Sequence, residues 1–218
     1  MCFSANASFA ASGVLTVVGA ASVRENKLKR GLMYALIPLL FAAQQFIEGW
    51  QWLSVQGSEP SRLLGYGFLF FATILWPSYV PISVYLIEPQ PDKKRRLGLF
   101  VFLGVIVSAY TFANLFFNPI TVAAESCCHV HYGFTIPFGM AVGCAYVVAT
   151  CGSMYFSSRG WVKTMSVIVF LSLLAAYLFT RATYVSVWCY FAAVISVLVL
   201  IHSRSTAGLA PASPLGKR

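Results

Sequence analysis

Residues 31–53 read GLMYALIPLLFAAQQFIEGWQWL, and this stretch decides what kind of protein the chain forms. It is long enough for one helix to cross a bilayer, which takes about 20 apolar residues. It also carries Gln44, Gln45 and Glu48, and residues three and four positions apart share one face of a helix. Gln51 follows Glu48 at the same spacing. The stretch therefore predicts a transmembrane helix with a polar face centred on Glu48.

Glu48 is the only acidic residue inside any apolar span that the sequence predicts. A charged side chain at the centre of a bilayer costs about 2.5–3.5 kcal/mol on insertion scales, so such residues usually mark a site. Two interpretations stay open. Glu48 is either a functional group, as a base or a ligand, or a structural residue that forms hydrogen bonds between helices.

The composition of the whole chain indicates an integral membrane protein. Of its 218 residues 59% are hydrophobic and 10% are charged, and the mean hydropathy is +0.76. Soluble domains carry about 25% charged residues. We expect an all-α, polytopic protein that lies in the lipid bilayer as a bundle of seven transmembrane helices.

The apolar segments define one transmembrane domain, residues 1–202, followed by a short polar tail, 203–218, that we expect to be disordered. Pro38 predicts a kink in the second span, and Pro77 and Pro81 predict a bent third span. The seven predicted spans are residues 3–22, 31–53, 63–87, 97–116, 133–155, 165–180 and 184–201.

The basic residues predict the orientation of the bundle. Thirteen of the 15 lie in the loops after spans one, three and five and in the tail, and the other two are Arg62 and Arg181. Positive charge in short loops is typical of the cytoplasmic side. We therefore expect the N-terminus outside and the C-terminus in the cytoplasm. The formal charge of +9 thus reflects topology, and a nucleic-acid partner is excluded.

This orientation brings most residues with usable chemistry to the outer end of the bundle. The loop 117–132 lies outside, and Glu48 lies in the outer part of its span. We therefore predict an outward-facing polar pocket whose floor is Gln44, Gln45 and Glu48 and whose lid is the loop 117–132. The other residues that we expect at this end are Cys2, Arg181, Trp188 and Cys189.

The loop contains the sequence Cys127-Cys128-His129-Val130-His131. In an extended segment Cys127, His129 and His131 lie on one side. One sulfur and two imidazoles are ligands for Zn or Cu, and Glu48 or Cys2 would complete the set. The alternative is a polar surface loop, with a disulfide that involves Cys127 or Cys128 in an oxidising compartment. No standard metal motif has this spacing.

Arg181 is a candidate partner for Glu48. An intramembrane charge generally needs a partner of opposite sign, so the two side chains form either a buried ion pair or two separate contacts. In the second case Arg181 extends to the outer headgroups.

Five stretches of the sequence resemble one known family. The stretches are MCFSA (1–5), PLLFAAQQFIEG (38–49), LWPSYVP (75–81), ATCG (149–152) and VSVWC (185–189). They resemble a bacterial family of uncharacterised seven-helix membrane proteins that begin with Met-Cys-Phe-Ser-Ala. The resemblance implies the seven-span fold and a bacterial inner membrane, and it supplies no catalytic roles. It draws attention to Cys2, Gln44, Gln45, Glu48, Cys151, Trp188 and Cys189.

Three functions are compatible with these observations. The first is a metal-assisted or acid–base enzyme at the outer leaflet, with Glu48 as base or ligand and His129 and His131 as ligands. The second is a small-solute or ion carrier, although spans 1–3 and 5–7 show no convincing repeat. The third is an accessory or scaffold subunit of a larger membrane complex, which would bring a partner protein or a homo-oligomer.

Overall fold

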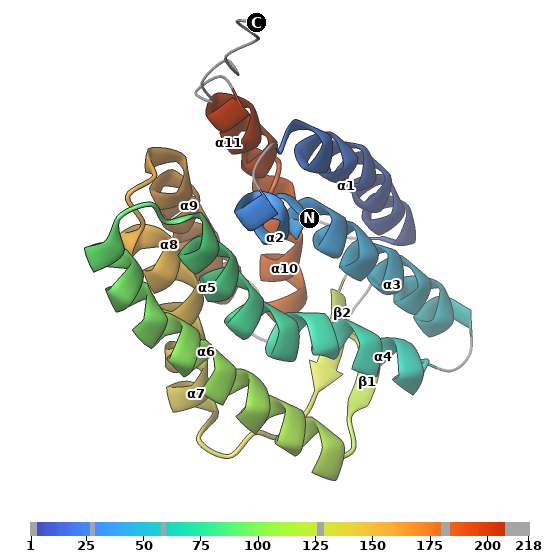
Figure 1. Cartoon of the computed structure of the whole chain (residues 1–218). Coiled ribbons are helices and arrows are strands. Elements are labelled where there is room, and N and C mark those ends of the chain that lie inside the picture. The colour runs from blue at the N-terminus through green and yellow to red at the C-terminus, as the bar shows by residue number, and fades with distance from the viewer. Residues whose placement is uncertain (1–3, 27–28, 58–59, 126–128, 180–183, 208–218) are drawn as a thin grey trace, which may run out of the picture.

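The computed structural model describes residues 4–26, 29–57, 60–125, 129–179 and 184–207. These residues contain seven helices that are long and apolar enough to cross a membrane (Figure 1). This confirms the prediction of an all-α, polytopic membrane protein, whose orientation remains a prediction. The seven helices are Ala5–Glu25, Leu32–Gly57, Arg62–Ile87, Pro91–Phe117, Gly139–Phe156, Gly160–Phe179 and Tyr184–Ile201.

The first two spans pack closely against each other through small residues. The first is α1 (Ala5–Glu25), and the second consists of α2 (Leu32–Ala35) and α3 (Ile37–Gly57), after the short 3₁₀ turn η1 (Lys29–Gly31). A Cβ atom on Gly19 of α1 would lie 2.8 Å from the backbone nitrogen of Leu39 in α3, so the two helices approach at a distance that requires glycine. The interruption between α2 and α3 falls at Leu36, next to the predicted kink at Pro38.

The third and fifth spans each contain a π-helical segment. The third consists of α4 (Arg62–Leu69), η2 (Phe70–Leu75) and α5 (Trp76–Ile87), and the fifth of α7 (Gly139–Val147), η3 (Val148–Gly152) and α8 (Ser153–Phe156). Hydroxyl groups of neighbouring helices donate to carbonyls of these segments: Ser108 Oγ to Ile74 O at 2.6 Å and Ser166 Oγ to Cys151 O at 2.6 Å. Such segments frequently occur at functional sites.

The fourth span, α6 (Pro91–Phe117), fits against the proline-containing part of α5. Pro81 has no N–H group, so it cannot donate to the carbonyl of Pro77 one turn earlier. Gly104 of α6 lies directly at this carbonyl, where a Cβ atom would come within 1.9 Å of Pro77 O. The glycine therefore allows the backbones of α5 and α6 to touch.

The last two spans are α9 (Gly160–Phe179) and α10 (Tyr184–Ile195) with α11 (Leu198–Ala207). Helix α11 continues to Ala207, five residues into the segment that the sequence predicts as a disordered tail. The residues after Ala207 lie outside the described part of the chain.

A β-hairpin follows α6 where the sequence predicts a loop. Strand β1 (Thr121–Glu125) pairs antiparallel with β2 (His129–Gly133), and Figure 1 shows the hairpin at one end of the bundle, beside α4. Val130 and Tyr132 alternate along β2 and are both buried. The ring of Tyr132 stacks on Phe68 of α4 at 4.4 Å, with 7° between the ring planes. The alternating apolar residues thus make the hairpin part of the core.

The opposite end of the bundle is held by Glu88, which follows α5. Its buried carboxylate accepts hydrogen bonds from Ser157 Oγ at 3.0 Å and from Ser158 N and Oγ at 2.8 and 2.6 Å. Arg159 Nε donates to Ile87 O at 3.1 Å. We call this contact between the loops that follow spans three and five the Glu88 clamp. The two loops lie at the same end, as an alternating seven-span topology requires.

Candidate functional site

Polar side chains from four elements meet at the middle of the bundle, next to the hairpin. All of them are buried, in a bundle of helices that are otherwise mostly apolar. Helix α3 contributes the largest part, and the sequence predicted its polar face. We call this group the polar cluster; its members are Gln44, Gln45, Glu48, Gln51 and Trp52 of α3, Trp76 of α5, Tyr132 of β2, and Ser186 and Cys189 of α10.

Glu48 is 2% exposed, and each of its carboxyl oxygens accepts one hydrogen bond. Gln45 Nε2 donates to Oε2 at 3.0 Å, and the hydroxyl of Ser186 donates a short bond to Oε1. Both donors are uncharged. A buried carboxylate normally has a cationic partner or a metal beside it. Since neither is found next to Glu48 among the described residues, its carboxyl group is suited to bind either a proton or a cation.

Gln44 connects the polar cluster to α5. Its side chain is fully buried, and its Oε1 accepts a 2.8 Å hydrogen bond from Trp76 Nε1. The thiol of Cys189 lies beside the Gln44 amide and close to Glu48. These contacts tie α3, α5 and α10 together around one polar centre.

Five buried polar atoms of the cluster have no hydrogen-bond partner among the described residues. Each such atom lowers the stability of the fold by about 1–3 kcal/mol, so the polar cluster destabilises the protein as long as these atoms have no partner. A polar molecule that both donates and accepts hydrogen bonds would satisfy them. The donors are Gln44 Nε2, Trp52 Nε1 and the Tyr132 hydroxyl, and the acceptors are Gln45 Oε1 and Gln51 Oε1.

The Tyr132 hydroxyl remains a donor at any physiological pH. Burial raises the pKa of Tyr132 well above its usual value. The hairpin therefore presents a neutral O–H group to the polar cluster.

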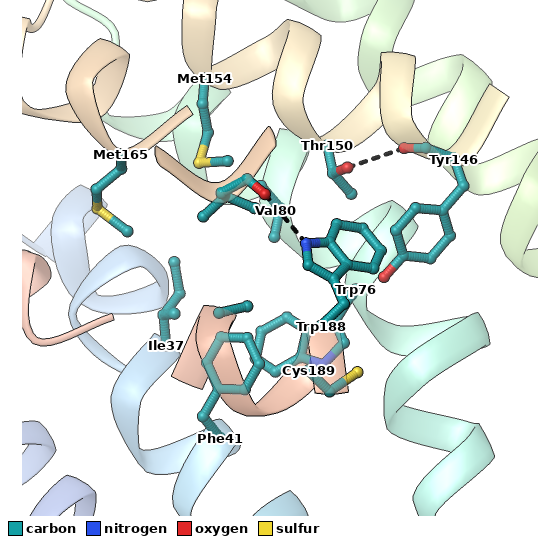
Figure 2. A pocket seen from close by; sticks show the side chains of 12 residues that line it. Ile37, Phe41, Trp76, Val80, Tyr146, Thr150, Met154, Met165, Trp188 and Cys189 are labelled. Carbon is teal, nitrogen blue, oxygen red and sulfur yellow. Dashed lines mark hydrogen bonds between the residues drawn. The ribbon is translucent and has the colours of Figure 1, made fainter. Parts of the chain in front are cut away.

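A cavity of about 50 Å³ adjoins the polar cluster (Figure 2). Trp76 and Cys189 belong to both, so the two regions are continuous. Figure 2 shows the rings of Phe41, Trp76, Tyr146 and Trp188 around the cavity. Trp188 is fixed by a 3.2 Å hydrogen bond from its Nε1 to Val169 O. The cavity is therefore an aromatic, mostly apolar chamber beside a polar wall.

The cavity and the hairpin lie on opposite sides of the polar cluster. Lining residues such as Ile37, Met154 and Met165 lie in the halves of their spans that lead to the Glu88 clamp. On the other side Tyr132, Phe68 and Trp52 pack together in one buried apolar cluster. Tyr132 of the predicted lid also lies close enough to Glu48 of the predicted floor to interact with it electrostatically. The cavity therefore lies on the side of Glu48 that leads to the Glu88 clamp.

The candidate metal ligands are only partly described. His131 lies on β2 between the inward-facing Val130 and Tyr132, so its side chain is on the strand face away from the polar cluster. Cys127 lies outside the described residues, and of His129 only the backbone is described. Within the described part of the chain no three His, Cys, Asp or Glu side chains group as metal ligands. The Zn or Cu site remains a prediction.

Other predicted site residues divide into two groups. Gln44, Gln45, Glu48 and Cys189 come together in the polar cluster, and Trp188 lines the cavity. Cys2 and Arg181 lie outside the described residues, and the ion pair between Glu48 and Arg181 remains a prediction.

Sequence reasoning missed Ser186, Tyr132 and the role of Trp76 as site residues. Ser186 carries a weak signal, because it is a hydroxyl group one turn before Cys189 in an apolar span. Tyr132 and Val130 alternate with the two histidines, a pattern that indicates an inward-facing apolar edge.

Comparison with known proteins identifies the family. No curated protein and no solved structure is significantly similar to this chain. One family model matches residues 1–213, nearly the whole sequence and all seven spans. The chain therefore belongs to DUF6629, a family of unknown function.

Proposed function

We propose that this protein is a small-solute carrier in which Glu48 exchanges a proton when the solute binds. The observation that carries the proposal is the environment of Glu48: a buried carboxyl group in a membrane span whose two hydrogen-bond donors, Gln45 and Ser186, are both neutral. A charge is unfavourable in this environment unless a counter-charge accompanies it. A proton or a cationic solute supplies that counter-charge in turn.

The distribution of open and packed volume supports a carrier. Gln44 lies at the middle of the span Leu32–Gly57, with Glu48 one turn further toward the hairpin. The cavity adjoins this level on one side, and the hairpin packs against it on the other. Carriers bind solute near the bilayer midplane and expose the site to one side at a time. An enzyme acting at the outer leaflet would need the open volume on the hairpin side.

The charge distribution and the family resemblance extend this proposal to the cell. From the basic loops we infer that the hairpin faces outside and the Glu88 clamp faces the cytoplasm, and from the family resemblance that the membrane is a bacterial inner membrane. In this orientation the cavity lies on the cytoplasmic side of Glu48.

An acid–base enzyme is the second candidate, and one contact favours it. The hydroxyl of Ser186 donates to Glu48 Oε1, which is the arrangement of a nucleophile and its general base. In that case a serine-directed fluorophosphonate would label Ser186, and Glu48→Gln would abolish the labelling. A carrier predicts no labelling of Ser186.

Proton movement in proteoliposomes tests the carrier directly. We would trap a pH-sensitive dye inside vesicles that contain the purified protein and add, one at a time, choline, alanine, glycerol and phosphate as solutes of four charge classes. We expect at least one solute to change the luminal pH, and Glu48→Gln to remove the change. Glu25→Gln, at the end of α1, is the matched control and should behave as wild type. A luminal pH that no solute changes, or an unaltered response in Glu48→Gln, would overturn the proposal.

A further inference from the structure

Aromatic rings make up much of the cavity wall. Phe41, Trp76, Tyr146 and Trp188 come from four different spans and face one volume of about 50 Å³ (Figure 2). Phe41 and Trp76 stack with their centroids 3.9 Å apart, and Tyr146 meets Trp188 edge to face at 5.5 Å. Aromatic faces attract cations, most strongly where water is excluded.

The remaining wall offers little to a solute that needs hydrogen bonds. It is completed mainly by aliphatic side chains and by the thioethers of Met154 and Met165. The hydroxyl of Thr150 already donates to Tyr146 O at 2.9 Å, and Trp188 Nε1 already donates to Val169 O. A primary ammonium group would lose its hydration here without replacement. A quaternary ammonium group has no N–H bonds and suits such a wall.

Glu48 is the acidic group near this cavity. It does not line the cavity itself, but Cys189 does, and the Cys189 thiol lies close to both Gln44 and Glu48. Two states of the site then have no net charge: protonated Glu48 with an empty cavity, and ionised Glu48 with a bound monovalent cation. Binding of the cation releases one proton from the Glu48 carboxyl group, so charge is conserved in the exchange.

We propose that the aromatic cavity binds a small quaternary ammonium group, with Glu48 as its counter-ion. This inference rests on the proposed carrier and names its class of solute. Because the cavity is small, we infer the smallest common quaternary head, trimethylammonium. Such a head is carried by a free solute of the choline type or by a choline lipid.

Equilibrium binding of radiolabelled choline to the full-length protein tests the proposal. The protein would be placed in nanodiscs of phosphatidylethanolamine and phosphatidylglycerol, which contain no choline head. We expect saturable binding, release of about one proton per choline, and competition at least tenfold weaker from 3,3-dimethylbutan-1-ol, the neutral carbon analogue. Equal competition by the neutral analogue would overturn the inference, because it would reduce the cavity to a generic apolar site.

Ring-specific variants make the test independent of folding. Tyr146→Phe keeps the aromatic face and should bind within about twofold of wild type, whereas Tyr146→Leu should bind at least tenfold more weakly. Phe112→Leu removes a ring that is 57% exposed on α6 and should leave binding unchanged. Equal affinity of Tyr146→Leu and Tyr146→Phe would contradict a cation–π site.

The binding and transport experiments together distinguish failure of this inference from failure of the proposed function, and they identify the source of the ligand. If alanine or glycerol drives Glu48-dependent proton movement and choline does not bind, the proposed carrier function stands and the quaternary ammonium solute is refuted. If choline binds without releasing a proton, the aromatic binding site stands and proton exchange at Glu48 is refuted. Addition of phosphatidylcholine to the nanodiscs lowers choline binding if lipid heads share the site, and leaves it unchanged if the ligand is a free solute.

Discussion

The indole N–H of Trp76 donates a 2.8 Å hydrogen bond to Gln44 Oε1, and this bond joins the polar cluster to the aromatic cavity. Both side chains are buried in the middle of the bundle. The bond also fixes the ring of Trp76 where the π-helical segment η2 ends and α5 begins. Any change at Trp76 should therefore affect stability and solute binding together.

Trp76→Phe tests how much this hydrogen bond contributes to stability. The variant keeps an aromatic ring against Phe41 but leaves Gln44 Oε1 without its donor, which costs about 1–3 kcal/mol. Thermal unfolding in detergent would measure the loss. Trp161→Phe, at a ring that is 45% exposed, is the control and should change stability by less than about 0.5 kcal/mol. Equal stability of the two variants would contradict the assigned hydrogen bond.

Tyr132 allows the hydroxyl and the ring to be tested apart. Tyr132→Phe removes a buried hydroxyl that has no partner among the described residues and keeps the stack on Phe68, so stability should stay the same or rise. Tyr132→Ala removes the ring and should cost about 3–5 kcal/mol. A loss of stability in Tyr132→Phe would show that the hydroxyl has a structural role.

Gly104 should tolerate no side chain. A Cβ atom there would lie 1.9 Å from Pro77 O, so Gly104→Ala must push α5 and α6 apart, at a cost of about 1–3 kcal/mol or more. Gly98→Ala on the same helix is the control, because no atom lies within 4 Å of its added Cβ. The yield of folded protein and its thermal unfolding would measure both. Equal behaviour of the two variants would contradict the close contact between α5 and α6.

The Glu88 clamp should respond to acid. Burial acts to raise the pKa of Glu88, but the hydrogen bonds from Ser158, Gln90 N and Ser157 outweigh it and hold the pKa below the usual 4.5. A lowered pKa means that folding favours the carboxylate. The clamp therefore contributes its full stability above pH 4.5 and loses it as the pH falls through the lowered value.

Glu88→Gln should remove this contribution at neutral pH, by about 2 kcal/mol for the lost bonds to a charged group. The difference in unfolding temperature between wild type and Glu88→Gln should shrink as the pH falls below 4.5. A difference that stays constant from pH 7 to pH 3 would show that the carboxylate charge does not hold the clamp.

Much of the architecture follows from the sequence, because each transmembrane span is a local pattern. The spans at Arg62–Ile87 and Tyr184–Ile201 begin and end within one residue of their predicted bounds. The shared face of Gln44, Gln45 and Glu48 also follows from helical spacing alone. The sequence predicts a loop where the hairpin lies, because each strand has only five residues and Val130 and Tyr132 alternate with two polar histidines.

The partners across helices could not be predicted from one sequence. Ser186 meets Glu48 only because α10 crosses α3 at that level, and no local pattern encodes the crossing. The same applies to Trp76 and Gln44, whose contact depends on the register that the π-helical segment η2 gives to α5. Local spacing therefore identified the acidic centre, and tertiary packing supplied the residues around it.

Infrared difference spectroscopy on choline binding is the most direct test of the central claim, the exchange of the Glu48 proton. The account predicts that choline removes the C=O band of a protonated carboxyl group and produces a carboxylate band, with one proton released per site. Neither change should occur in Glu48→Gln. A carboxyl spectrum that solute binding leaves unchanged, or a band change that persists in Glu48→Gln, would contradict the account.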